Sequence, residues 1–321
     1  MTFAFADPGV ETPRLPSKPA FGLLDTPASS SPVVTPEPDP TDQHERASAR
    51  PKRRFSPGKL AGHVILLALA VFSILPVYWM FAAALRAPGD VLDQSIIPWP
   101  ISFETFADAW TRIGLGEMLL NTILLSAGIA AGQMLVALLA GYGFAMWRFP
   151  GRNVILMLFI GSWLIPFQVT MIPNYVLISD LGLLGTLWGV ILPNLGAAFA
   201  VLLMRQHMES FPREIIDAAK VDGRSSWNTL WTVVVPNVTP AIAATTIMLF
   251  ISAWNEYLWP ALVLRTGAPV LQVGIRQFLS SEGNDWGALM AASAIAALPI
   301  LLLYLFLQRY IVDAFVRSGL K

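Results

Sequence analysis

The sequence predicts an all-α, polytopic membrane protein with six transmembrane helices. Of its 321 residues, 55% are hydrophobic and only 13% are charged, whereas a soluble globular protein carries about 25% charged residues. Six apolar runs follow one another, and each is near the ~20 residues that a helix needs to cross a bilayer. These runs lie at 62–85, 118–144, 154–178, 187–205, 240–263 and 288–308.

Residues 1–57 are predicted to form a disordered, Pro-rich cytoplasmic tail ahead of a six-span domain at 58–321. Nine prolines lie between residues 8 and 40, among Ser, Thr, Asp and Glu. A segment of this composition cannot bury enough apolar surface to offset its ordering entropy. It also lacks the basic start and apolar core of a signal peptide.

The basic residues alternate between the two sides of these runs. A basic cluster at 50–59 precedes the first run, whereas the loop at 86–117 holds five carboxylates against two arginines. The positive-inside rule therefore predicts that both termini are cytoplasmic. The other basic residues on the cytoplasmic side follow runs two, four and six, and they are Arg148, Arg152, Arg205, Arg213, Lys220, Arg224, Arg309, Arg317 and Lys321.

The long outer loop at 86–117 is expected to carry a short helix at 103–110. Phe103, Phe106, Ala107 and Trp110 share one face at helical spacing, so the helix is expected to cap the outer membrane surface. Two small-residue pairs within the spans, at 128–132 and 185–189, match a pattern for close helix packing. Packing inside one bundle is favoured over a dimer motif.

A polar island at 211–240 separates runs four and five, and its pattern predicts a helix–turn–helix. Pro212 suits a first helical turn, and Gly223 suits the position just past a helix end. Ser225 or Ser226 can cap the second helix. Charged residues fall on one side of the first helix, and small or apolar ones on the other. The charged set is Arg213, Glu214, Asp217 and Lys220. The small or apolar set is Ile215, Ile216, Ala218 and Ala219.

The order Pro-x-Glu-x-x-Asp-Ala-Ala-x-x-Asp-Gly in this island, with prolines thirteen and seventeen residues later, resembles the "EAA" loop of ABC-importer permeases. In that family the loop is a cytoplasmic coupling helix that docks into a groove of the ATPase subunit. Asp217 stands where the family usually has Glu, and Arg224 stands where it usually has Ala. The resemblance implies that the ATPase-coupling residues are Glu214, Asp217, Ala218, Ala219, Asp222 and Gly223.

The resemblance extends over roughly residues 60–321. Segments at 171–175, 181–186, 254–256 and 308–310 look like the sugar-importing, maltose-type branch. The C-terminal segment after Tyr310 departs from the family's usual Gly-rich end. The resemblance implies a bacterial inner-membrane permease subunit for a sugar or related polyol. Its implied partners are a second permease, two ATPase subunits and an extracytoplasmic solute-binding protein, and ATP and Mg are expected on the ATPases.

Trp254, Asn255 and Glu256 are predicted to line the substrate path or the binding-protein contact. An aromatic face can stack on a sugar ring, and an amide can bond its hydroxyls. An ionisable residue within a span is a functional candidate. Glu256 also lies near the outer end of run five among aromatic residues, so an interfacial placement is the other interpretation.

Several functions are disfavoured. The only Gly-Lys pair, at 58–59, is not part of a phosphate-binding loop, so we expect no ATP hydrolysis by this chain and no catalytic residues. There is no Cys, and the three His residues show no ligand spacing, so no metal site is expected. Zero net charge gives no sign of nucleic-acid binding. A gradient-driven secondary transporter is the alternative function, but it would need paired ionisable residues at mid-membrane and repeated spans.

Overall fold

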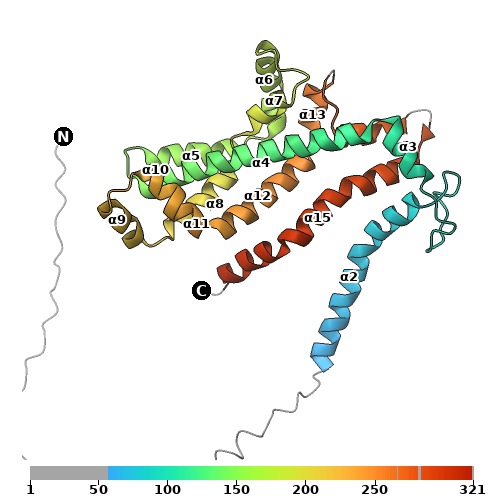
Figure 1. Ribbon diagram of the computed structural model, residues 1–321, viewed down its shortest axis with the longest axis horizontal. Helices are drawn as coiled ribbons and strands as arrows, with labels where there is room; N and C mark the ends of the chain where they lie inside the picture. The colour runs from blue at the N-terminus through green and yellow to red at the C-terminus, as the bar shows by residue number, and fades with distance from the viewer. Residues whose placement is uncertain (1–56, 266, 281–282, 320–321) are drawn as a thin grey trace, which may run out of the picture. The chain divides into compact units, whose positions relative to one another are not determined.

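The computed structural model describes residues 57–265, 267–280 and 283–319 (Figure 1). Regular structure within this part of the chain is helical, apart from the short antiparallel pair β1 (Leu279–Ser280) and β2 (Gly283–Asn284). The predicted all-α class is confirmed for these residues. The predicted tail lies outside them, except that its last residue, Pro57, begins the first helix.

Three helices are long and apolar enough to cross a membrane, and they correspond to predicted runs one, two and six. These are α2 (Pro57–Ala84), α4 (Leu115–Met146) and α15 (Trp286–Gly319). A helix rises about 1.5 Å per residue, so the 32 residues of α4 exceed the thickness of a bilayer core. Its ends therefore reach both membrane surfaces if the helix stands across the bilayer.

Each of the third and fourth runs was predicted as one span, but in the structure each is broken into two helices. α5 (Arg152–Trp163) and α6 (Phe167–Asp180) meet at 95°. Helix α7 (Leu187–Ile191) continues through η1 (Leu192–Asn194) and meets α8 (Ala198–Glu209) at 49°. Pro166 and Pro193 stand at these breaks, where the missing N–H removes a helical hydrogen bond.

The fifth predicted run, 240–263, also differs from the structure. A third bent pair joins the 226–237 segment to α12 (Thr239–Trp254) at 83°. α12 then ends at Trp254, and a separate helix α13 (Leu258–Val263) follows. The described residues thus contain three clear spans, or up to six if each bent pair is one span.

The broken fourth run packs against α4 at the small residues noted in the sequence. A Cβ at Gly128 would lie 3.0 Å from Ile191 Cδ1, and a Cβ at Gly132 would collide with Leu195 Cδ2. Gln133 Nε2 donates to the freed carbonyl of Asn194 at 2.6 Å. The pair at 128–132 therefore serves packing within the chain, as predicted.

The predicted outer helix is present as α3 (Glu104–Arg112), which packs on the rest of the chain through a different face from the aromatic one. Thr105 and Ala109 are buried, whereas Phe103 and Trp110 are exposed. The short elements α14 (Leu271–Gly274) and η3 (Ile275–Phe278) lie in the loop that was predicted to be on the same side. A core cluster joins the end of α2 to α3, the start of α4 and the first half of α15.

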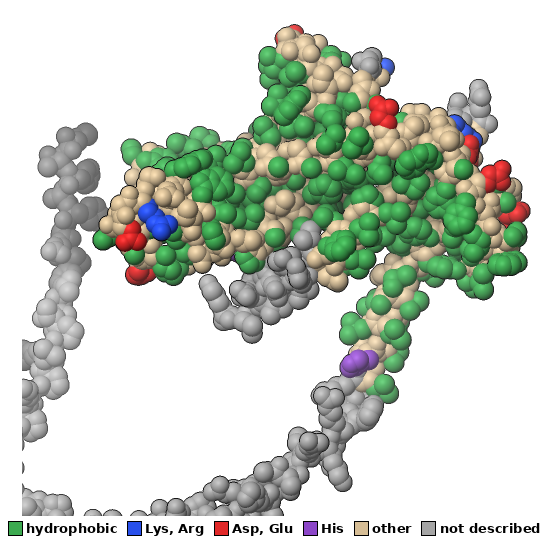
Figure 2. Space-filling model, in the orientation of Figure 1, with side chains coloured by type: hydrophobic (Ala, Val, Ile, Leu, Met, Phe, Trp, Pro, Cys, Tyr) green, Lys and Arg blue, Asp and Glu red, His purple; other side chains and the backbone are tan. Residues whose placement is uncertain are grey.

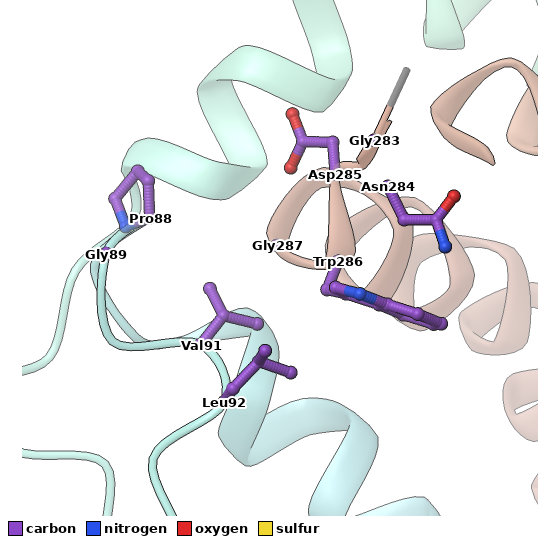
Figure 3. A pocket seen from close by; sticks show the side chains of 9 residues that line it. All are labelled: Pro88, Gly89, Val91, Leu92, Gly283, Asn284, Asp285, Trp286 and Gly287. Carbon is purple, nitrogen blue, oxygen red and sulfur yellow. The ribbon is translucent and has the colours of Figure 1, made fainter. Parts of the chain in front are cut away.

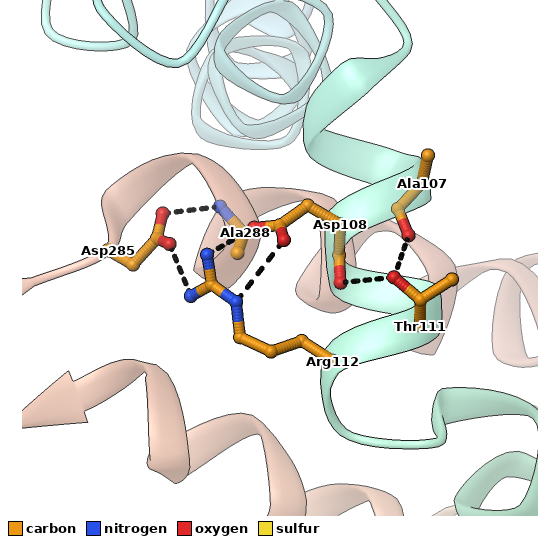
Figure 4. Close-up of polar contacts among 6 residues, drawn as sticks. All are labelled: Ala107, Asp108, Thr111, Arg112, Asp285 and Ala288. Atoms are coloured by element: carbon orange, nitrogen blue, oxygen red, sulfur yellow. Dashed lines mark hydrogen bonds and ion pairs between the residues drawn. The ribbon is translucent and has the colours of Figure 1, made fainter.

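An ion-pair network ties α3 to the start of α15 (Figure 4). The Arg112 guanidinium lies 2.5 Å from Asp108 and 2.7 Å from Asp285, and Asp285 also accepts the Ala288 N–H at 3.0 Å. Partial burial raises the pKa of Asp285, but the Ala288 N–H and Arg112 lower it more, so the net pKa is below the usual range. The Asp285 hydrogen bond raises the pKa of Arg112. Both groups are therefore charged near neutral pH.

Candidate functional site

The candidate site is the helix pair that joins runs four and five, which consists of α9 (Arg213–Val221) and the segment that begins at α10 (Ser226–Thr229). Pro212 precedes α9. Glu214 lies in the first turn of α9 and Lys220 in its last turn, where the helix dipole favours a negative and a positive charge, respectively. Gly223 adopts φ +78, a conformation that favours glycine. The Ser225 hydroxyl accepts the Asn228 N–H at 3.3 Å. The predicted helix–turn–helix is confirmed.

Backbone hydrogen bonds close the turn between the two helices. The Gly223 N–H donates to the Lys220 carbonyl at 2.9 Å, and the Arg224 N–H donates to the Ala219 carbonyl at 3.0 Å. This is the pattern by which a left-handed glycine satisfies the last carbonyls of a helix. Nothing lies within 4 Å of a Cβ built at Gly223, so the backbone conformation, rather than space, requires glycine there.

α9 is attached to the rest of the chain by a narrow stripe. Ile216 and Ala219 are buried, and Ile216 belongs to a core cluster with Tyr142, Met208 and Leu230. Ile215 and Ala218, which were predicted on the same inner side, are exposed. Successive residues are rotated by about 100° around a helix, so the residues that directly precede the buried Ile216 and Ala219 point away from the core. Ala219 therefore serves packing within the chain.

The outward face of α9 combines carboxylates with apolar side chains. Asp217 and Lys220 form an ion pair at 2.8 Å, and both side chains are about two-thirds exposed. An exposed pair of this kind contributes little stability. Val221 is 87% exposed. Glu214 and Asp222 are exposed and have no ion pair within the described part of the chain. Charged side chains of both signs gather over this end in Figure 2.

The second helix anchors the pair. It runs through α10, the π-helical turn η2 (Leu230–Val234) and α11 (Val235–Asn237). Leu230 and Val234 are buried, while Trp227 is exposed and meets Trp231 edge to face at 5.5 Å. The apolar side chains of the second helix are thus only partly buried.

The core behind the helix pair is built from α4, α8 and α12. A Cβ at Gly141 of α4 would lie 3.0 Å from the backbone nitrogen of Arg205 in α8. Close-packed protein interiors have low compressibility and transmit strain. A force on α9 therefore reaches α4 and α8 through Ile216 and Leu230.

Helices α9 and α3 lie at opposite ends of α4, since α9 lies at the Met146 end and α3 lies at the Leu115 end (Figure 1).

The three predicted substrate-path residues do not form one open surface. Trp254 is 1% exposed and stacks on Phe250 at 5.7 Å. Asn255 is exposed, and its Nδ2 donates to the Ile251 carbonyl at 2.8 Å. Glu256 Oε1 accepts the N–H groups of Leu258 and Trp259 at 3.1 and 3.3 Å. Glu256 thus caps α13, and of the three side chains only Asn255 is exposed.

Two polar features were not assigned a role from the sequence. Gln133 of α4 donates to the Asn194 carbonyl, which lies at the end of η1 and therefore lacks a helical partner. The Arg276 guanidinium lies 4.0 Å from the ring centre of Tyr257, just after the end of α12. No local pattern pairs these last two residues, because nineteen positions separate them.

The fold of broken and continuous apolar helices, with a projecting helix pair at one end, defines a membrane-transport permease. The chain belongs to the family of binding-protein-dependent transport system inner membrane components, whose model matches residues 133–317. This match covers more than half of the chain and includes the helix pair.

Relatives agree with this assignment. The chain is 30% identical over 259 residues to the arabinooligosaccharides transport system permease protein AraQ of Halalkalibacterium halodurans, covering 79% of this chain and 93% of that protein. It is also 30% identical over 255 residues to the lactose transport system permease protein LacG of Rhizobium radiobacter, covering 79% of this chain and 93% of that protein.

A solved structure shares the fold. It is a bacterial ABC transporter involved in the import of the acidic polysaccharide alginate, and the match has a TM-score of 0.68 at 24% sequence identity. The alignment covers 86% of this chain and 99% of the other.

Proposed function

We propose that this chain is a permease subunit of an ATP-driven ABC importer and forms half of the translocation path for a sugar or a related polyol. The observation that carries the proposal is the outward face of α9, which exposes Asp217 and Val221 on a helix fixed to the span core by Ile216. Family membership and the saccharides named for the relatives support it. A gradient-driven secondary transporter would leave this projecting helix without a role.

In this proposal α9 is the coupling helix and docks into a groove of an ATPase subunit. Glu214, Asp217 and Asp222 supply acidic contacts, and Ala218 permits close approach. Ala219 and Gly223 contribute indirectly, because Ala219 fixes the helix and Gly223 closes the turn after it. Closure of the ATPases would move α9, and the core behind it would move α4 and α8.

The remaining assembly follows from the same proposal. The partners are a second permease, two ATPase subunits and an extracytoplasmic solute-binding protein. Each bent pair counts as one span, which gives six, and the positive-inside pattern puts α9 and both termini on the cytoplasmic side of a bacterial inner membrane. The chain itself holds no cofactor, since ATP and Mg bind the ATPase subunits.

Uptake into proteoliposomes distinguishes the two functions. The reconstituted transporter should import a labelled oligosaccharide only with ATP inside and the binding protein outside. Collapse of the proton and sodium gradients with ionophores should leave the rate unchanged. Uptake that survives without ATP but stops with ionophores would assign the chain to gradient-driven transport.

The disordered tail proposed at 1–57 is expected to be dispensable for transport. Deletion of residues 2–48 keeps the basic cluster that marks the cytoplasmic flank. Uptake per transporter should stay near that of the full chain, because the deleted composition cannot form a packed contact. Loss of the ATPases from the purified deletion complex would show instead that the tail binds a partner.

Asn255 is the proposed path residue with an exposed amide, since Trp254 is buried against Phe250 and Glu256 caps α13. Asn255→Ala should lower the uptake rate and raise the half-saturating substrate concentration without changing the amount of protein in the membrane. The matched control is Asn237→Ala, which removes a similar side-chain bond to the carbonyl four residues earlier. A fall in abundance alone would make Asn255 a structural residue.

A further inference from the structure

An open cavity of about 450 Å³ lies at the turn between α4 and α5. Every residue that lines it falls between positions 148 and 154, and the two charged ones are Arg148 and Arg152. We refer to these two side chains and the cavity beside them as the arginine site. The outward face of α9, which carries the proposed function, shares none of these residues.

The arginine site carries a surplus of positive charge. Arg152 Nη2 lies 2.7 Å from Glu209 Oε1, and Arg205 Nη2 lies 2.8 Å from the same oxygen. Arg148 is exposed and has no ion pair within the described part of the chain. The segment 205–224 holds four cations and four carboxylates, so it adds no net charge. The two arginines of the turn are therefore not neutralised at this end of α4.

Arg152 is held in place before any ligand binds. Its side chain is only 17% exposed, and its Nη2 donates to Glu209 at 2.7 Å. A guanidinium has several N–H donors, and this bond to Glu209 leaves others for an anion. Arg side chains suit phosphate because two parallel N–H groups match two phosphate oxygens. The chemistry of the site therefore favours a phosphate group.

An exposed apolar stripe begins at the arginine site and follows α5. Val154, Met157 and Leu158 share one face of the helix, at i, i+3 and i+4, and are 61%, 72% and 69% exposed. Trp147, in the turn, is also exposed, as aromatic residues at a membrane interface are. A dissolved phosphate would gain nothing from this stripe, whereas the acyl chain of a lipid would cover it.

A cavity at the opposite end of α4 has a different character. It lies between the loop at 88–92 and the start of α15, has a volume of about 530 Å³, and is called the outer groove below (Figure 3). Of the described residues that line it, Asp285 alone is charged. Its lining therefore offers no cation to a phosphate, so the features of the arginine site are not common to the cavities of this chain.

We propose that the arginine site binds the phosphate of an anionic phospholipid of the cytoplasmic leaflet, with an acyl chain along the stripe of α5. The proposal rests on the proposed function, which puts the turn between α4 and α5 on the cytoplasmic side. Anionic lipids give that leaflet a negative surface potential, which attracts basic side chains next to a span. Glu209, which Arg152 holds, is the last residue of α8, shortly before α9 begins at Arg213. A bound lipid would thus steady the base of the coupling helix.

The test is native mass spectrometry of the complete transporter in detergent with added phosphatidylglycerol, which measures the Kd of the first bound lipid. Arg148→Gln should raise that Kd about fivefold, the effect of one cation at an anionic membrane surface. Since Arg148 has no internal partner, its replacement should leave the fold intact. Arg148→Lys should restore most of the affinity, because it restores the charge. Binding of the zwitterionic phosphatidylcholine should be the same in all three proteins.

The matched control is Arg265→Gln, which removes an exposed arginine outside the arginine site. It should keep the wild-type Kd for phosphatidylglycerol. An unchanged Kd in Arg148→Gln, or an equal rise in Arg265→Gln, would overturn the proposal. Displacement of phosphatidylglycerol by an equal concentration of inorganic phosphate would also overturn it, because the site would then bind a soluble anion.

The same spectra report which subunits each complex contains. Loss of the second permease from Arg148→Gln would overturn the proposal, because the turn would then be a contact between permeases. A wild-type complex that holds no ATPase would instead refute the proposed function, whatever lipid the chain retains.

Discussion

Asp217→Lys should abolish uptake while the chain stays inserted in the membrane. The Asp217 carboxylate is about two-thirds exposed, and within the described residues it pairs with the equally exposed Lys220, so it can also meet a cation of the ATPase. Loss of one partner of a buried interfacial charge pair costs about 2–5 kcal/mol. Reversal adds repulsion, so ATPase co-purification should fall by more than tenfold.

Gly223→Asp should have the same outcome through the backbone. The left-handed conformation at Gly223 costs a side chain roughly 1–2 kcal/mol, and the strain falls on the turn that orients α9. Gly151→Asp is the matched control, since Gly151 has φ +80 and an equally open surrounding. Comparable loss of ATPase binding in Gly151→Asp would mean that strain anywhere in the chain, and not the turn after α9, explains the effect.

The second large effect is expected at Gly189 of α7. A Cβ there would lie 3.0 Å from Val263 Cγ1 and 3.1 Å from Ile178 Cγ2, and it would collide with the Leu183 carbonyl oxygen. A backbone atom cannot turn aside as a flexible side chain can. Gly189→Val should therefore cost more than the ~1–3 kcal/mol typical of core overpacking, and little assembled protein should reach the membrane.

Gly161→Val provides the comparison for Gly189→Val, because nothing lies within 4 Å of a Cβ at Gly161. Fluorescence-detected size-exclusion chromatography after heating measures both variants against the wild type. Gly161→Val should keep the wild-type profile. A wild-type melting temperature for Gly189→Val would show that the contact among α6, α7 and α13 is not tightly packed.

The local parts of the fold were predictable because their signals are local. Pro212, Gly223 and Ser225 each act within one helical turn, and the helix pair formed where they indicated. The long apolar runs gave α2, α4 and α15 for the same reason. The break after Trp254 was missed because the apolar composition resumes at Tyr257, directly after Asn255 and Glu256, although Glu256 is a capping residue in retrospect.

Features that depend on distant contacts could not be predicted from one sequence. Helical spacing placed Ile215 beside Ile216, but only the packing of α4 and α8 decides which of the two is buried. The burial of Trp254 against Phe250 likewise depends on how α12 meets α15 and α4. The outer groove joins residue 88 to residue 285, a juxtaposition that no motif encodes.

The central claim is that the outward face of α9 contacts an ATPase, and site-specific photocrosslinking tests it most directly. The chain contains no cysteine, so a single cysteine carries a thiol-directed photoreactive probe at one place only. Val221→Cys labels the exposed face, and Ala219→Cys is the buried control on the same helix. Val221→Cys should give a covalent product with the ATPase subunit, and Ala219→Cys should give little. A Val221→Cys complex that transports substrate yet gives no ATPase product would contradict the central claim.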